Sequence, residues 1–428
     1  MAEIQPLKGI RYTPKSGTDI GPRLAPPYDV LSDADKRALL QRDPANFVKI
    51  DLPHTPPKFA GPPEAYAAAK TTLDEWLKAG VMKQDAQPAI YVYHQAYTHA
   101  GRKYLRKKFF VRLRLEEFGK GSVYPHEQTF GGPKEDRLLL TQATACNLSP
   151  IFGLFEDPSN AVSALLDRAI ASLSPILTGD AEGVSNTVWA VTDSATIAAV
   201  QAAMRDKAIY IADGHHRYGT GLNYRARLQE KGGPLAADHP ANYVLCVCCP
   251  MSDAGLLILP THRVMPGLAI TETALIGESS IQVAPLNAPS ADAALEAVAA
   301  MGPQAFVFVR ADGKMFSVKP RDPALLDSLE PNHSAAWRRL ALAFLHAYVI
   351  DRVLTPKVCA GKPPEIHYVK NVAEAVGEAK ETKGCVFLMQ PNTMEELRQV
   401  CLAGDLMPQK STFFFPKLAS GLVVNPLA

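Results

Sequence analysis

The stretch AIYIADGHHRYGTGLNYRARLQEKG, residues 208–232, joins two kinds of secondary structure. Residues 208–212 are apolar and contain two isoleucines, a pattern typical of a short buried strand. Residues 216–231 carry apolar side chains at helical spacing, and the Gly-Gly-Pro segment that follows ends this pattern. Between them lie an acid, a glycine, two histidines and an arginine. The stretch therefore predicts a strand that is followed at once by a helix, with a polar cluster at the junction.

Strands and helices alternate along the rest of the chain as well, which predicts an α/β or α+β fold with mixed sheets. Residues 63–80 have the spacing of an amphipathic helix, and residues 46–53 alternate as a strand does. Residues 89–118 predict an antiparallel hairpin that turns near residues 99–102. Residues 334–354 predict one long buried helix. In the second strand of the hairpin, the basic side chains at outward positions predict a solvated sheet face: Arg106, Lys108, Arg112 and Arg114.

The length of 428 residues favours more than one domain. We expect an N-terminal α/β segment with the hairpin over residues 1–115 and a core that carries the polar cluster over residues 116–260. A C-terminal α/β domain packed on this core is expected over residues 261–428.

The composition is that of an ordinary globular protein in a reducing compartment. Apolar residues make up 47% and charged residues 21% of the chain, and the net charge of +2 does not favour a DNA-binding protein. The odd number of cysteines, 7, forms no disulfide framework, and Cys246, Cys248 and Cys249 are interpreted as small buried side chains. No apolar run has the length of a membrane span. We therefore expect a cytoplasmic protein.

The junction at residues 213–217 has the chemistry of an anion site. The first N–H groups of a helix have no acceptor within the helix, and the helix dipole favours negative charge there. Gly214 allows a sharp turn, and Arg217 offers a planar, permanently charged fork to phosphate oxygens. His215 and His216 can donate hydrogen bonds or transfer protons, and Asp213 can hold magnesium or a ligand hydroxyl. A structural Arg–Asp bridge with a core histidine pair is the alternative.

A second cluster lies in YPHEQTFGGPKEDRLLL, residues 124–140. Glu135 and Asp136 stand in the first turn of a predicted helix, where the dipole alone explains acidic residues. Glu127 follows His126 in a turn, where a helix gives no reason for an acid, and its carboxylate could deprotonate a substrate hydroxyl. A solvated loop glutamate is the alternative.

The segment near residue 410 comes close to a phosphate-binding loop but does not match it. Gly404, Lys410 and Ser411 fit the pattern, whereas Gln409 stands where a glycine is needed and a strand follows instead of a helix. We reject the loop and keep Lys410, with Lys417, as a basic residue that could line a pocket.

Several motifs, taken in order, resemble the domain-of-unknown-function family numbered ten-fifteen. The resemblance covers nearly the whole chain and implies no activity. It is carried by the segments APPYDV, HEQTFGGPKEDRL, NLSPIFGLF, IADGHHRY and MPQKSTFFFPKLASGL.

A second resemblance does imply an activity. Pro125-His126-Glu127 and Asp213-Gly214-His215-His216-Arg217 are similar, in this order, to two motifs of free-serine kinases with the ParB/sulfiredoxin-like fold. This resemblance implies a ParB/sulfiredoxin-like core with large elaborations. It also implies that Glu127 is the base and that residues 213–217 bind nucleotide phosphate and substrate. The chain lacks the cysteine of sulfiredoxin, so that activity is not expected.

The sequence therefore predicts a phosphotransferase that uses ATP or ADP with Mg²⁺ and acts on a small hydroxylated metabolite. Glu127, His126 and Asp213 are its expected catalytic residues. The expected phosphate-binding residues are Gly214, His215, His216, Arg217 and Lys410. A nucleotide and a small substrate are the expected partners; a membrane and DNA are not, and homo-oligomer formation stays open. The alternatives are a ParB-like regulator that binds nucleotide or DNA without turnover and a metal-dependent hydrolase that uses His126, His215 and His216.

Overall fold

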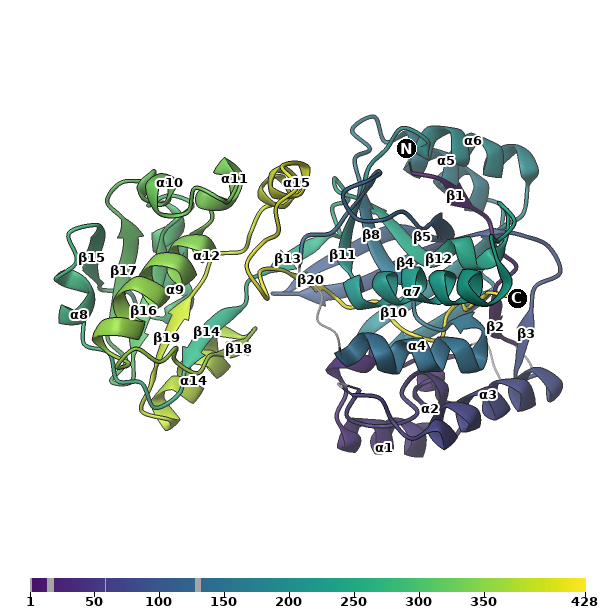
Figure 1. Cartoon of the computed structure of the whole chain (residues 1–428), viewed down its shortest axis with the longest axis horizontal. Coiled ribbons are helices and arrows are strands. Elements are labelled where there is room, and N and C mark those ends of the chain that lie inside the picture. Colours follow the sequence, from purple (N-terminus) through teal and green to yellow (C-terminus); the bar gives the residue numbers. More distant parts are fainter. Residues whose placement is uncertain (1, 14–18, 58, 128–131) are drawn as a thin grey trace. The chain divides into compact units, whose positions relative to one another are not determined.

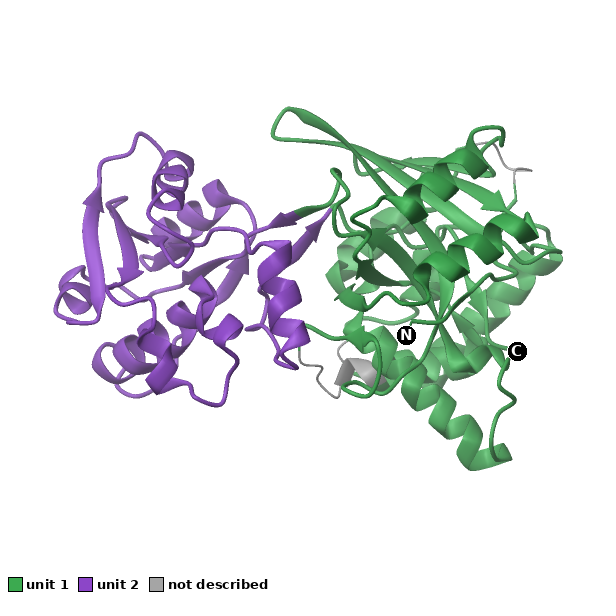
Figure 2. Ribbon diagram, turned by 90° about the horizontal axis from the view of Figure 1, so that it is seen from above, with its two compact units in different colours: residues 1–257, 416–428 green, residues 258–415 purple. Residues whose placement is uncertain are grey.

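The chain folds into two compact units of mixed α/β structure. The structure is a computed structural model that describes residues 2–13, 19–57, 59–127 and 132–428. Figure 2 distinguishes the first unit, Met1–Leu257 with Pro416–Ala428, from the second unit, Ile258–Phe415. The chain thus leaves the first unit once and returns to it for its last residues.

A nine-stranded mixed sheet forms the centre of the first unit (Figure 1). The β11–β6 and β12–β8 pairs are parallel, and the other neighbouring strands are antiparallel. In spatial order the strands are β6 (Val123–Tyr124), β11 (Ile209–Asp213), β8 (Ile151–Phe155), β12 (Tyr243–Pro250), β5 (Arg102–Arg114), β4 (Ile90–His99), β10 (Val184–Val191) and β9 (Leu177–Ala181), with β1 (Ile4–Gln5) paired to β5.

Helices α5, α6 and α7 contact strands of this sheet, and α4 packs on α7 with α1 to α3 beyond it, on the side away from α5 and α6 (Figure 1). Ser32 and Asp35 form a capping box at the start of α1. Short antiparallel pairs join β2 (Ile10–Tyr12) to β3 (Met82–Gln84) and β7 (Cys146–Asn147) to β21 (Asn425–Pro426). The helices are α1 (Asp33–Arg42), α2 (Val48–Asp51), α3 (Pro63–Lys78), α4 (Gly132–Thr144), α5 (Ala161–Ile170), α6 (Ser194–Met204) and α7 (His215–Gly232), with 3-10 turns η2 (Gly21–Arg23), η3 (Tyr28–Val30) and η4 (Pro240–Asn242).

The core of the first unit contains side chains that lie two residues apart along strands of the sheet. Ile209 and Ile211 of β11 belong to the same fully buried cluster as Cys246 and Cys248 of β12. These cysteines are free and buried beside Cys249, which confirms that they serve as small apolar side chains. Among the described residues, no helix is both long and apolar enough to span a membrane.

The second unit has its own sheet and its own core. Val307, Val386 and Leu388 lie at the centre of that core. The strands, in spatial order, are β15 (Ile281–Leu286), β17 (Met315–Pro320), β16 (Phe306–Arg310), β19 (Cys385–Leu388), β14 (His262–Met265) and β18 (His367–Val369), and β13 (Leu257–Leu259) pairs with β20 (Phe413–Phe415). The helices are α8 (Thr273–Ile276), α9 (Ala291–Ala299), α10 (Leu325–Leu329), α11 (Ala335–Arg338), α12 (Ala341–Ala343), η5 (Phe344–Leu354), α13 (Thr355–Lys357), α14 (Val372–Glu381) and α15 (Met394–Leu402).

Two predicted elements are wrong. Within residues 46–53, Val48–Asp51 form the short helix α2 instead of a strand, and the Asn46 side chain accepts a hydrogen bond from the Val48 N–H at 2.9 Å where this helix begins. Residues 334–354 do not form one helix. Leu340 has extended backbone angles (φ −70°, ψ 137°) that separate α11 from α12, and the remainder, η5, is π-helical.

The predicted solvated face of the hairpin is also wrong for its two central residues. Arg106 and Lys108 are only 0% and 2% exposed. The returning chain segment covers this face: Arg106 Nη2 donates to the Pro416 carbonyl at 2.5 Å, and Gln95 Nε2 donates to the Lys417 carbonyl at 3.2 Å. Both cations also donate to Gln95 Oε1. Arg112 and Arg114 are partly exposed.

The expected domain boundaries differ from the two compact units. Strands from the expected segment 1–115 and from the expected core 116–260 share one sheet, because β5 pairs with β12. The expected C-terminal domain 261–428 contains residues 416–428, which belong to the first unit.

Candidate functional site

The predicted strand–helix junction is present at the end of β11. The strand ends at Asp213, Gly214 has a left-handed conformation (φ 91°, ψ 26°), and α7 begins at His215. Gly214 has no side chain with which to cap the first N–H groups of α7. A β-carbon at this position would lie 3.1 Å from the Arg217 guanidinium carbon and 3.1 Å from the Ile151 Cα. The backbone angle and the close contacts both explain why a glycine stands here.

Asp213 holds two cations at this junction. Its Oδ1 is 3.0 Å from Arg217 Nη2, and its Oδ2 forms an ion pair with Lys417 Nζ. Burial acts to raise the pKa of Asp213, but the charges of Lys417 and Arg217 hold that pKa well below its usual range. Asp213 is therefore an anion over the whole physiological pH range. Two cations and the helix dipole face this carboxylate, which leaves the cluster positive.

Two buried histidines contact each other at this junction: His126 follows β6, and His215 is the first residue of α7. The His126 N–H donates to His215 Nε2 at 3.2 Å, and the two rings lie edge to face with their centroids 4.7 Å apart. Burial lowers the pKa of His215 well below its usual value, and the neighbouring His126 acts in the same direction. His126 Nδ1 lies 2.6 Å from the Ile211 carbonyl, which can only accept, so this nitrogen carries a proton.

Glu127 lies beside this histidine pair. Its Oε1 is 3.9 Å from His126 Nε2, and its side chain is 27% exposed. Contacts through His126 and His215 therefore connect Glu127 with the start of α7. Residues 128–131 of the same motif lie outside the described residues. A base role for Glu127 stays a prediction.

Lys410 and Lys417 lie in different units. Lys410 is an exposed residue of the second unit with a left-handed backbone (φ 55°), and its carbonyl accepts from Arg263 Nη2 at 3.0 Å. Lys417 belongs to the first unit and reaches Asp213. The predicted phosphate contact of Lys410 therefore stays a prediction, whereas Lys417 joins the cluster at the junction.

A pocket in the first unit begins at Arg217. His216 and the N-terminal turns of α7 lie next to it, because Thr220 lines the pocket and donates to the His216 carbonyl at 2.8 Å. The lining includes the apolar side chains of Leu140, Leu148 and Val244 together with polar and charged side chains. The lining residues are Tyr28, Asp51, Arg137, Leu140, Thr141, Cys146, Asn147, Leu148, Ser149, Arg217, Thr220 and Val244.

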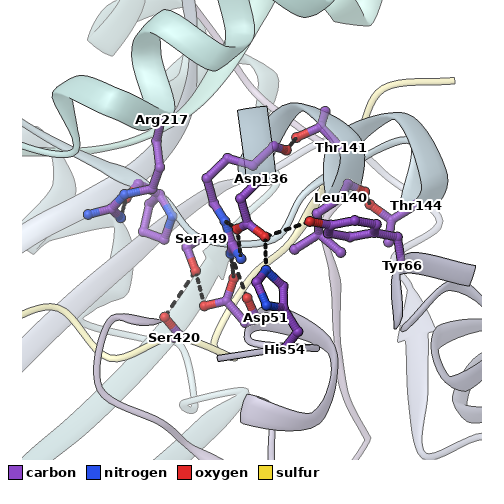
Figure 3. A network of polar contacts seen from close by, with 12 residues as sticks. Asp51, His54, Tyr66, Asp136, Leu140, Thr141, Thr144, Ser149, Arg217 and Ser420 are labelled. Carbon is purple, nitrogen blue, oxygen red and sulfur yellow. Dashed lines mark hydrogen bonds and ion pairs between the residues drawn. The ribbon is translucent and has the colours of Figure 1, made fainter. Parts of the chain in front are cut away.

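Arg137 is held in this pocket from three directions. Its Nε donates to Asp136 Oδ2 at 2.7 Å, its Nη1 donates to the Asp51 carbonyl at 2.5 Å, and its guanidinium carbon lies 3.9 Å from the centroid of the Tyr28 ring. Figure 3 shows Asp136 between His54 and Tyr66, which contact its Oδ1 at 2.6 and 2.7 Å. Asp136 is thus part of a buried network and does more than favour the start of a helix.

Sequence reasoning did not assign the polar lining of this pocket. The motif APPYDV, which contains Tyr28, entered only the family resemblance. The motif KEDRL contains Asp136 and Arg137, and Asp136 was explained by the helix dipole alone. Asp51 and Ser149 share a hydrogen bond of 2.5 Å, and Ser149 lies 3.0 Å from Ser420, as Figure 3 shows. The polar residues of these two motifs were the available signal.

The described residues contain no group of three or more His, Cys, Asp or Glu side chains placed to hold a metal ion. His126 and His215 instead contact each other and the backbone.

The sequence matches the family model "Protein of unknown function (DUF1015)" over residues 4–343. The chain therefore belongs to this family. None of the curated proteins compared with the sequence matches it.

Solved structures with a similar backbone include a free serine kinase variant in complex with ADP, with 13% identity, a TM-score of 0.36, and coverage of 74% of this chain and 92% of that one. A conserved hypothetical protein from Pyrococcus furiosus has 14% identity, a TM-score of 0.35, and coverage of 74% and 95%. C-terminally truncated SbnI from Staphylococcus aureus has 12% identity, a TM-score of 0.33, and coverage of 72% of this chain and 84% of that one. Because all three TM-scores are below 0.5, no residue role is transferred from these proteins.

Proposed function

We propose that the chain binds a nucleotide with its phosphates at the start of α7 and transfers a phosphoryl group to a small hydroxylated metabolite. The observation that carries this proposal is the convergence of Arg217 and Lys417 on Asp213 beside the glycine that opens α7. This cluster offers two cations and the N–H groups of a helix start against one directly bound carboxylate. A polyphosphate is the ligand that best matches such an excess of positive charge.

On this proposal, phosphate oxygens take the place of Asp213 as partners of Arg217 and Lys417, and the Asp213 carboxylate becomes available. A carboxylate at the end of a strand is a suitable oxygen ligand for Mg²⁺, which would neutralise charge on the transferred phosphoryl group. The proposed role of Asp213 is therefore to hold the cation of the bound nucleotide.

Glu127 is the proposed base. It takes the proton of the acceptor hydroxyl, the hydroxyl oxygen forms the new bond to phosphorus, and the bond between phosphorus and the bridging oxygen of the nucleotide breaks. The nucleotide leaves with one phosphoryl group fewer. His126, which lies 3.9 Å from this carboxylate and contacts His215, positions Glu127 relative to α7.

The test measures phosphoryl transfer from ATP or ADP, with Mg²⁺, to a panel of hydroxylated acids, sugars and amino acids. Glu127→Gln is expected to lower turnover at least 100-fold while nucleotide binding, followed by thermal shift, changes little. Glu135→Gln is the matched control, because Glu135 is an exposed acid in the first turn of α4. The base assignment fails if wild type and Glu127→Gln share the same background rate. A nucleotide response without turnover would favour a non-catalytic, ParB-like regulator.

A further inference from the structure

The pocket between Arg217 and Arg137 is a second polar site, next to the start of α7 but with its own chemistry. Arg217 is common to both places, because it binds Asp213 and also lines the pocket. From Arg217 the lining continues to Arg137, Asp51 and Ser149, which lie on other elements of the first unit. The phosphate contacts proposed above do not use these three residues.

Arg137 is prepared to bind a planar anion. It is 5% exposed, and its contacts to Asp136, Asp51 and the Tyr28 ring fix the plane of the guanidinium. Its Nη2 lies 2.5 Å from Asp136 Oδ2. A guanidinium carries five N–H hydrogens, so these contacts with the described residues leave donors on the terminal nitrogens. A fork of this kind matches the two oxygens of a carboxylate.

The charges around Arg137 favour a single negative charge over a phosphate. Asp136 contacts its Nε, and the Asp51 carboxylate lies 3.6 Å from its Nη1. Arg217, at the other end of the pocket, shares the Asp213 carboxylate with Lys417. A dianion placed at Arg137 would meet the repulsion of two nearby carboxylates, whereas a monoanionic carboxylate meets less of it.

The rest of the lining suits a short carbon chain with a hydroxyl group. Leu140, Leu148 and Val244 supply apolar contact. Burial raises the pKa of the Cys146 thiol to about 12, so this side chain is neutral as well. Ser149 offers a hydroxyl group, held by Asp51 Oδ2, to a polar group of the ligand.

We infer that this pocket is the acceptor subsite and that the acceptor is a small hydroxycarboxylic acid whose carboxylate is bound by Arg137. This inference rests on the proposed function. The carboxylate end lies at Arg137, and the hydroxyl end lies toward Arg217, where the phosphoryl group is proposed to bind. Arg137 is then a specificity-determining residue at the end of the acceptor that does not react. His54 and Tyr66 act through Asp136 as positioning residues for Arg137.

Three compounds with the same three-carbon frame test the inference: glycerate, serine and glycerol. Thermal shifts of the full chain are measured with each compound and with inorganic phosphate, without nucleotide. At least one of the two carboxylates is expected to stabilise the wild type, while glycerol and phosphate are not. Arg137→Lys is expected to raise the dissociation constant of that acid about 10- to 100-fold.

Two further variants separate a binding effect from a folding effect. Arg11→Lys is the matched control, because Arg11 is similarly buried (7% exposed) and its Nε lies 2.8 Å from Asp85 Oδ2. Neither residue lines the pocket. It should leave the response to the acid unchanged. Thr220→Met places a long side chain in the pocket without removing any charge, and it should abolish the response even if Arg137→Lys does not fold.

The inference is overturned if neither acid stabilises the wild type, if glycerol or phosphate acts as strongly, or if Thr220→Met keeps the response. The proposed function has a separate readout, the thermal shift with ADP and Mg²⁺. A response to the acid without a response to nucleotide would uphold the carboxylate pocket and reject the kinase.

Discussion

Replacing Gly214 by alanine tests whether the start of α7 is shaped for a ligand or only for a turn. Alanine in a left-handed conformation costs about 1–2 kcal/mol of stability. The new β-carbon would also lie 3.1 Å from Arg217 Cζ and from Ile151 Cα. The strand backbone of Ile151 is held in the sheet, so Arg217 has to move, and overpacking of this kind costs about 1–3 kcal/mol more. We expect a total loss of about 2–5 kcal/mol.

The matched control is Gly80→Ala, because Gly80 also has a positive φ (72°) but no atom within 4 Å of the added β-carbon. It should lose only the 1–2 kcal/mol of backbone strain. Urea denaturation measures both losses, and thermal shift with ADP and Mg²⁺ measures binding. Gly214→Ala should lose the nucleotide response because the Arg217 guanidinium is displaced, and Gly80→Ala should keep it. Equal losses of stability, together with an intact nucleotide response in Gly214→Ala, would refute the reasoning.

Two further predictions concern buried charges. The folded-state pKa of Asp213 is lowered, so its ion pairs contribute stability that is present above pH 5 and declines as pH falls below about 4. The advantage of wild type over Asp213→Asn, about 3–5 kcal/mol near neutral pH, should therefore shrink in urea denaturation at acidic pH, and a constant difference would contradict the assignment. Burial lowers the pKa of Lys108, so Lys108→Met, which removes a desolvated amine, should leave the free energy of unfolding unchanged or raise it by up to about 2 kcal/mol. A loss of more than 2 kcal/mol in the same assay would show that Lys108 stabilises the fold.

Local patterns predicted the central part of the site. A short apolar strand, a glycine and a helix are all readable within residues 208–232, and the structure places their boundaries at Asp213 and His215. The cap of α1 was predictable for the same reason, because Ser32 and Asp35 are three residues apart. Features of this kind depend on neighbours in the chain, so one sequence is sufficient to identify them.

Contacts between distant segments were not predictable from one sequence. The alternation of β5 indicates two faces, but it does not reveal that the chain near Pro416 covers the face that carries Arg106 and Lys108. In the same way, the acids at the start of α4 fit a helix dipole, whereas the partners of Asp136 come from the loop and helix that contain His54 and Tyr66. A local explanation was sufficient in both cases and concealed the tertiary one.

The late return of the chain to the first unit affects the order in which the protein can mature on the ribosome. Asp213 and Lys417 are separated by 204 residues, and the whole second unit, Ile258–Phe415, is translated between them. A nascent chain that already contains β11 and α7 therefore holds Asp213 without this cation and Arg106 without the Pro416 carbonyl. The proposed anion site gains its second cation only after the second unit has been translated, so a shorter nascent chain is not expected to bind nucleotide with full affinity.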